Sequence, residues 1–108
     1  MENYEKLLLK INNISSRLFK NSNGEVYIFG SQARRDFHSD SDWDLLILIE
    51  NSTGKENDFN EYGFPFCEMG WENDIDINPL VYSKKEWEAQ RYSFFFHNIM
   101  KDAIKLYS

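Results

Sequence analysis

Two aspartates at the start of an apolar run are the residues of this sequence best placed to do chemistry. Asp42 and Asp44 are separated by Trp43 and are followed at once by the apolar residues 45–49. Side chains two positions apart on a strand point to the same side, so the two carboxylates would share one face. Adjacent carboxylates repel each other, and a divalent cation between them reverses that repulsion. Because carboxylate oxygens are hard ligands, the pair predicts a site for Mg²⁺ or Mn²⁺.

A glycine and a serine upstream of the aspartates predict a place for phosphate. Gly30 and Ser31 follow a short apolar segment and precede residues that would start a helix. Glycine lets the backbone turn sharply, and the N–H groups at a helix start attract anions. Arg34 and Arg35, one turn further on, would add charge-assisted hydrogen bonds. A metal-binding pair beside a phosphate site is the equipment for phosphoryl or nucleotidyl transfer.

A third carboxylate would complete a site for two metal ions, and Asp76 is the best candidate. It lies between Ile75 and Ile77 in a segment with strand character. A carboxylate there is unfavourable in a core but is sensible if it faces a metal. Asp74 falls on the same face and is the alternative. No cysteine or histidine cluster accompanies these acids, so zinc is not expected.

The elements that must position these residues can be predicted from the apolar patterns. β-Branched and aromatic residues predict strands over 25–29, 42–50 and 74–82. The second strand would be buried on both faces, and Pro79 gives the third an edge position or a bend. The expected helices are residues 4–20, residues 32–36 with Ser31 as N-cap, a segment within 58–71 that Gly63 and Pro65 interrupt, one that starts from the capping box at 83–86, and a closing helix from Phe96 to Tyr107.

Composition restricts the class of partner. Twelve basic and eighteen acidic residues give a net charge of -6, which argues against a nucleic-acid binder with a broad basic surface. Cys67 is the single cysteine, so no intrachain disulfide is possible. The charged start of the chain does not resemble a signal peptide, and the longest apolar run, 45–49, is too short to span a bilayer. We therefore expect a cytoplasmic protein with no membrane partner.

The segment GSQARRDFHSDSDWDLLILI, residues 30–49, resembles the signature of the minimal nucleotidyltransferases in the DNA polymerase beta superfamily. That signature is a Gly-Ser-x-Ala-Arg-Gly block followed by Ser-Asp-x-Asp-Leu. The residues that agree with it are Gly30, Ser31, Ala33, Arg34, Ser41, Asp42, Asp44 and Leu45. The segment DIDINPLVYSKKEW is a weaker match to the family's third acidic strand. Arg35 departs from the pattern, because the family usually has glycine there.

The resemblance implies an α+β fold in which a small mixed β-sheet is flanked by helices, with residues 1–108 as one nucleotidyltransferase domain. It implies that Asp42 and Asp44 hold two Mg²⁺ ions and that Gly30 and Ser31 contact the triphosphate of a nucleotide. By the same matching, Asp76 is the third ligand or helps to activate the attacking hydroxyl. The implied reaction transfers a nucleoside monophosphate while pyrophosphate leaves. We expect AMP to be moved from ATP to a hydroxyl acceptor.

The resemblance also suggests the kind of acceptor. Family members of this size often act beside a helical protein of the higher-eukaryote-and-prokaryote nucleotide-binding (HEPN) type, and some are antitoxins that nucleotidylate that partner. Others resemble transferases that modify aminoglycosides, so a small-molecule acceptor is also expected. The alternative function is a non-catalytic nucleotide-binding or protein-interaction module that keeps the fold. A lost third acid would favour that alternative.

Overall fold

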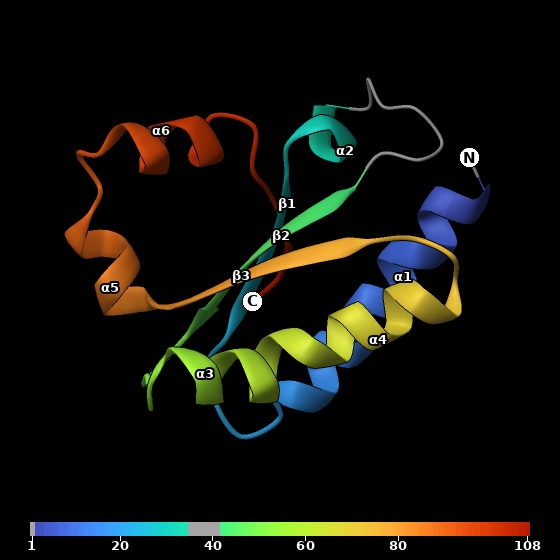
Figure 1. Ribbon diagram of the computed structural model, residues 1–108, viewed down its shortest axis with the longest axis horizontal. Helices are drawn as coiled ribbons and strands as arrows, with labels where there is room; N and C mark the ends of the chain where they lie inside the picture. Colours follow the sequence, from blue (N-terminus) through green and yellow to red (C-terminus); the bar gives the residue numbers. More distant parts are fainter. Residues whose placement is uncertain (1, 35–41) are drawn as a thin grey trace.

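The computed structural model describes residues 2–34 and 42–108, and within them four strands form one mixed sheet in the order β3-β2-β1-β4 (Figure 1). β1 pairs antiparallel with β2 and β4, whereas β2 pairs parallel with β3. The strands are β1 (Glu25–Phe29), β2 (Trp43–Ile49), β3 (Ile77–Ser83) and β4 (Ile104–Tyr107). The predicted mixed sheet flanked by helices is therefore confirmed.

Helices cover both faces of this sheet (Figure 1). Residues 43, 45, 47 and 49 of β2 pack into a cluster with side chains of α1 and α4, whereas Leu46 and Leu48 pack with Trp87 of α5 and Ile99 of α6. The central strand is thus buried on both faces, as its continuous apolar run predicts. The described helices are α1 (Glu2–Leu18), α2 (Ser31–Arg34), α3 (Lys55–Asp58), the π-helical turn η1 (Phe59–Gly63), α4 (Phe64–Glu72), α5 (Lys84–Ala89) and α6 (Phe94–Met100).

The helical segment 55–72 continues without a gap, and the predicted interruption at Gly63 and Pro65 takes the form of a change of helix type. A π-helical turn joins α3 to α4. There the N–H of Phe64 donates to the carbonyl of Phe59, five residues earlier. Pro65 then occupies the first turn of α4, where the missing N–H of proline is tolerated.

The closing segment differs more from the prediction. A helix through Tyr107 was expected, but α6 ends at Met100 and residues 104–107 form β4. β4 pairs with β1, whose edge would otherwise be open. Apolar residues close together at a chain's end fit either element, and pairing with a distant strand decides between them.

The third strand begins at Ile77, three residues later than predicted. Residues before it form the turn that ends α4: Asp74 has a φ of 58°, and the N–H of Ile75 donates to the carbonyl of Gly70 at 2.9 Å. β3 is an edge strand, as Pro79 predicts. The capping box that Ser83 forms at the start of α5 is also confirmed.

Candidate functional site

Asp42 and Asp44 lie at the end of the sheet where β1 finishes and where β2 and β3 begin. Asp44 pairs with Phe29 of β1 on one side and with Asn78 of β3 on the other. It is partly buried and shares a face with Leu46, whereas Asp42 is exposed. α2 follows β1 at this same end of the sheet (Figure 1).

The side chain of Asn78 joins the two carboxylates. Its Nδ2 donates to Oδ2 of Asp42 at 3.0 Å and to Oδ1 of Asp44 at 3.5 Å. Asn78 lies two residues after Asp76, so period-two alternation puts the two on one face of a strand, but nothing in the sequence singles Asn78 out. The parallel register of β2 with β3 is what brings it to the aspartates. A neutral carboxamide thus occupies the space beside the acidic pair.

The environment of Asp44 makes its carboxyl group harder to ionise than a free one. Partial burial raises the pKa of its carboxyl group, the hydrogen bond from Asn78 lowers it, and the charge of Asp42 raises it, with a net rise. Burial and a neighbouring like charge both disfavour the ionised carboxylate. The pair therefore carries excess negative charge that a divalent cation would neutralise.

Gly30 provides the turn that brings β1 into contact with this pair. Its φ is 75°, in the left-handed region, and the N–H of Arg34 donates to its carbonyl at 3.2 Å. A Cβ atom at Gly30 would lie 2.7 Å from Oδ2 of Asp44. The carboxylate thus occupies space that only glycine leaves open. Ser31 follows as the first residue of α2 and is partly buried.

Arg34 reaches toward the C-terminal part of the chain. Its Nη1 donates to Oδ2 of Asp102 at 2.9 Å, and the two side chains are 45% and 20% exposed. This ion pair ties α2 to the segment between α6 and β4. The predicted contact of Arg34 with phosphate stays a prediction. Arg35 lies outside the described residues.

Asp76 is not gathered with the other acids into a metal-binding cluster. It is exposed and precedes β3, and its backbone carbonyl accepts the N–H of Trp43 at 2.9 Å. Within residues 2–34 and 42–108, no group of three His, Cys, Asp or Glu side chains is arranged to hold a metal ion. Asp74 is exposed too. The structure thus brings Asp42, Asp44 and Gly30 together, and the role of Asp76 stays a prediction.

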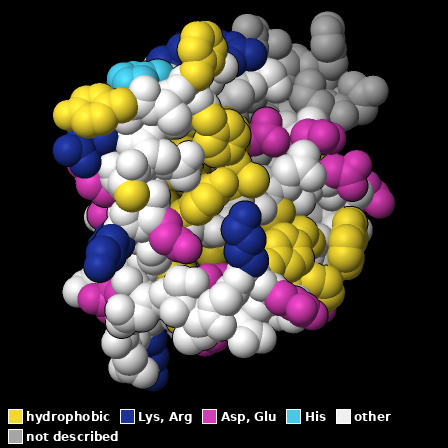
Figure 2. All heavy atoms as spheres, turned by 60° about the vertical axis from the view of Figure 1, so that its left-hand side comes forward, with side chains coloured by type: hydrophobic (Ala, Val, Ile, Leu, Met, Phe, Trp, Pro, Cys, Tyr) yellow, Lys and Arg dark blue, Asp and Glu magenta, His cyan; other side chains and the backbone are white. Residues whose placement is uncertain are grey.

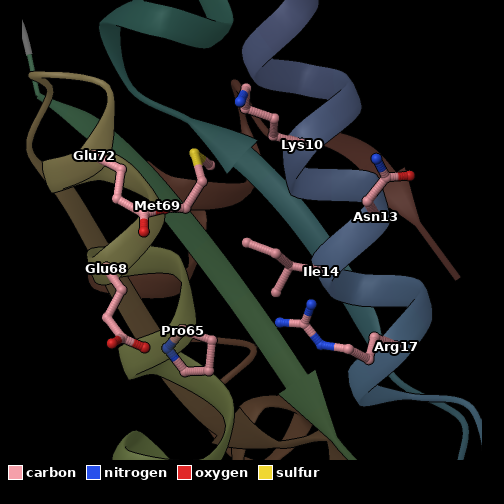
Figure 3. A pocket seen from close by; sticks show the side chains of 8 residues that line it. All are labelled: Lys10, Asn13, Ile14, Arg17, Pro65, Glu68, Met69 and Glu72. Atoms are coloured by element: carbon pink, nitrogen blue, oxygen red, sulfur yellow. The ribbon is translucent and has the colours of Figure 1, made fainter.

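A cavity of about 340 Å³ between α1 and α4 is separate from this site (Figure 3). Lys10 and Arg17 of α1 line one side, and Glu68 and Glu72 of α4 line the other. These helices cover the sheet face opposite the one that carries Asp44. The cavity therefore belongs to the packing of the two helices and not to the acidic site.

The mixed sheet with helices on both faces is the fold expected of a nucleotidyltransferase domain. Residues 8–101 match the family model described as a nucleotidyltransferase domain, so the chain belongs to that family. The predicted resemblance and the predicted enzyme class are thereby confirmed. A comparison with curated proteins gives no match.

Two solved structures share the fold. One is a crystal structure described as "a putative nucleotidyltransferase from Sulfolobus solfataricus", 20% identical, with a TM-score of 0.65 over 96% of this chain and 82% of that chain. The other is the crystal structure of a toxin–antitoxin with AMP-PNP, 14% identical, with a TM-score of 0.56 over 90% of this chain and 73% of that chain. At these identities the likeness concerns the fold alone. In the part of the chain that the structure describes, no helix is both long and apolar enough to cross a bilayer.

Proposed function

We propose that this protein transfers AMP from ATP to a hydroxyl acceptor, with pyrophosphate leaving. The observation that carries the proposal is the contact between Asp44 and Gly30: a partly buried carboxylate lies against the turn that follows β1, at the spacing the family signature implies. Nucleotidyl transfer needs a binding site for the triphosphate next to a pair of acidic residues. Membership of the nucleotidyltransferase family supports the same reaction class.

Asp42 and Asp44 are the residues that would hold Mg²⁺. They fit it because their carboxylates supply oxygen donors that converge on one side chain, Asn78, and because neither is fully buried. Asn78 would turn its carboxamide so that Oδ1 faces a cation, since this side chain has a donor at one end and an acceptor at the other. When bound, Mg²⁺ neutralises charge on the phosphates of the nucleotide. A second ion and Asp76 as its ligand remain part of the proposal.

The chain's own part is to hold the triphosphate in line with the acceptor. Gly30 lets the backbone turn sharply at the end of β1. The hydroxyl of Ser31 donates a hydrogen bond to the phosphate oxygens, and Arg34 adds a positive charge next to them. The acceptor oxygen then forms a bond to the α-phosphorus as the bond to pyrophosphate breaks. Asp76 directly precedes β3 at the same end of the sheet, and it takes the proton of the acceptor hydroxyl.

The acceptor we propose is a hydroxyl of a partner protein of the helical HEPN type, as in a toxin–antitoxin pair. The fold shared with a toxin–antitoxin structure that contains AMP-PNP supports this choice. A small-molecule acceptor is the second candidate, and the net charge of -6 disfavours nucleic acid. A cytoplasmic location is proposed with it, because the single cysteine, Cys67, is buried and free.

Incubation with α-labelled ATP and Mg²⁺ tests the reaction. The protein is mixed with a HEPN-type protein or with hydroxyl-bearing aminoglycosides, and label on the acceptor and released pyrophosphate are measured. We expect transfer that Asp42→Asn and Asp44→Asn each reduce by at least about 100-fold, since each removes charge needed in the transition state. Glu68→Gln, which removes a charge from the opposite face, should leave the rate unchanged.

Asn78 favours a second candidate, a module that binds nucleotide without turning it over. A carboxamide stands beside the acidic pair, and no three-acid cluster exists among the described residues. This candidate predicts Mg²⁺-dependent ATP binding with no pyrophosphate release on any acceptor. Absence of ATP binding in the presence of Mg²⁺ would contradict both candidates.

A further inference from the structure

We propose that a cavity beside Gly30 receives the nucleoside of the triphosphate, with aromatic walls against the base and Asn98 at its polar edge. The inference rests on the proposed function and adds to it a separate place for the base. The cavity has a volume of about 390 Å³ and is lined by residues from β1, α2, β3, α6 and the segment that follows α6. That volume lies in the range of pockets that hold small ligands.

The cavity and the acidic pair lie on the same face of the sheet. Phe29, which lines the cavity, is the β1 partner of Asp44. Leu80, which lines it from β3, lies two residues after Asn78 and so points to the same side. Figure 2 shows this face: hydrophobic side chains line a hollow, and acidic side chains lie at its upper edge.

Gly30 is common to both features. It lines the cavity, and the position of its missing Cβ lies 2.7 Å from Oδ2 of Asp44. A ligand whose phosphates meet the turn at Gly30 would therefore extend directly into the cavity. Arg34 and Asp102, which form an ion pair at 2.9 Å, also line the cavity.

The lining suits a flat ring with polar edges. Phe95 is 43% exposed, and its ring meets the ring of Trp87 edge-on with centroids 5.9 Å apart, so the Phe95 ring is held in place while one side stays accessible. Such a ring offers a surface on which a base can stack. Asn98 supplies a donor and an acceptor at the same wall, and Lys101 a positive charge. Apolar walls with this polar rim favour a nucleoside over a purely apolar ligand.

Binding of ATP and of inorganic tripolyphosphate, each with Mg²⁺, separates the cavity from the phosphate site. We expect Phe95→Ala to weaken ATP binding about tenfold, because one stacking surface is lost, and to leave tripolyphosphate binding unchanged. Phe94→Ala is the matched control, since Phe94 is the neighbouring residue of α6, is 82% exposed and does not line the cavity. It should change neither affinity. Asn98→Ala should weaken ATP binding selectively as well, and it serves as the second variant if Phe95→Ala does not fold.

The possible results distinguish failure of the cavity proposal from failure of the proposed function. Normal ATP binding by both cavity variants overturns the cavity proposal and leaves the proposed function in place. An equal loss of tripolyphosphate and ATP binding in either folded variant also overturns it, because the side chain would then act on the phosphates. Failure of the wild-type protein to bind either ligand with Mg²⁺ overturns the proposed function itself, and the cavity proposal with it.

Discussion

At the scale of single residues, Gly30 has a left-handed backbone conformation, and the carboxylate of Asp44 packs closely against it. Gly30→Ala would strain the turn and push Asp44 from its place, since the new Cβ would lie 2.7 Å from its oxygen. We expect a loss of about 1–3 kcal/mol in stability, and a loss of Mg²⁺-dependent ATP binding. Urea denaturation and titration calorimetry measure the two effects.

Gly54 provides the control for this substitution. Its φ of 112° is also positive, but nothing lies within 4 Å of the position where its Cβ would be. Gly54→Ala should therefore lower stability through backbone strain and leave ATP binding intact. Equal ATP affinity of Gly30→Ala and the wild type would contradict the role given to the close approach.

Asn78 offers a test of the proposed cation site. Asn78→Asp would place a third carboxylate beside Asp42 and Asp44, because the side chain at this position already contacts both. Without metal, the repulsion should lower the melting temperature by about 2–6 °C, and Mg²⁺ should raise it by more than it raises that of the wild type. Scanning calorimetry with and without Mg²⁺ checks this, with Asn78→Ala as the variant that adds no charge. Equal Mg²⁺ shifts in Asn78→Asp and the wild type would count against a cation site here.

The raised pKa of Asp44 predicts how stability depends on pH. The pKa of its carboxyl group is higher in the folded than in the unfolded protein, so ionisation of Asp44 costs stability above the folded pKa, and the cost disappears below the ordinary value of 3.8. In the absence of metal, Asp44→Asn should stabilise the protein at pH 7 by on the order of 0.5 kcal/mol, a figure reduced for solvent screening. The gain should vanish near pH 3. Melting curves across this pH range measure it, and a gain that grows toward low pH would contradict the burial argument.

At the scale of elements, local patterns predicted the parts that position the site. The strand over 25–29 matches β1, and the apolar run after Asp44 forms the doubly buried β2. Pairing between distant segments explains what the sequence did not reveal. β4 exists because β1 offers it an edge, and Asn78 meets the aspartates because β3 lies parallel to β2 in one register. Period-two alternation put Asn78 on the right face, but no local signal fixes that register.

The capping box at the start of α5 should contribute measurably to stability. Ser83 Oγ accepts the N–H of Glu86 at 3.0 Å, and Glu86 Oε1 accepts the N–H of Ser83 at 2.9 Å. Ser83→Ala should cost about 1 kcal/mol, because the helix start loses its side-chain acceptor. Glu86→Gln keeps both hydrogen bonds and should cost less. Urea denaturation compares the two variants, and equal stabilities would contradict a role for the serine as a cap.

At the scale of the whole molecule, one strand joins the clusters on both faces of the sheet. Leu45 and Leu46 are neighbours in β2 with no exposed surface, yet they belong to different clusters. Leu45→Ala and Leu46→Ala should each cost about 2–5 kcal/mol and should shift one common unfolding transition. Leu9→Ala, at a residue that is 63% exposed, should have little effect.

Two probes can follow that transition. Trp43 belongs to one cluster and Trp87 to the other, so tryptophan fluorescence and far-ultraviolet circular dichroism should give coincident curves in urea. A curve in two steps, one shifted by Leu45→Ala and the other by Leu46→Ala, would show that the two faces unfold separately.

The sheet has a second end, remote from the aspartates, and it is under different constraints. There the chain passes from α1 into β1 and from β2 into α3, and the N–H of Asn23 donates to the carboxylate of Glu50 at 3.0 Å to tie these two bends together. Beyond them, Gly54 faces open space. Changes in the length or composition of the loops at this end of the sheet should not move Gly30 or Asp44. A longer loop at Gly54 should therefore be tolerated without any displacement of the acidic pair.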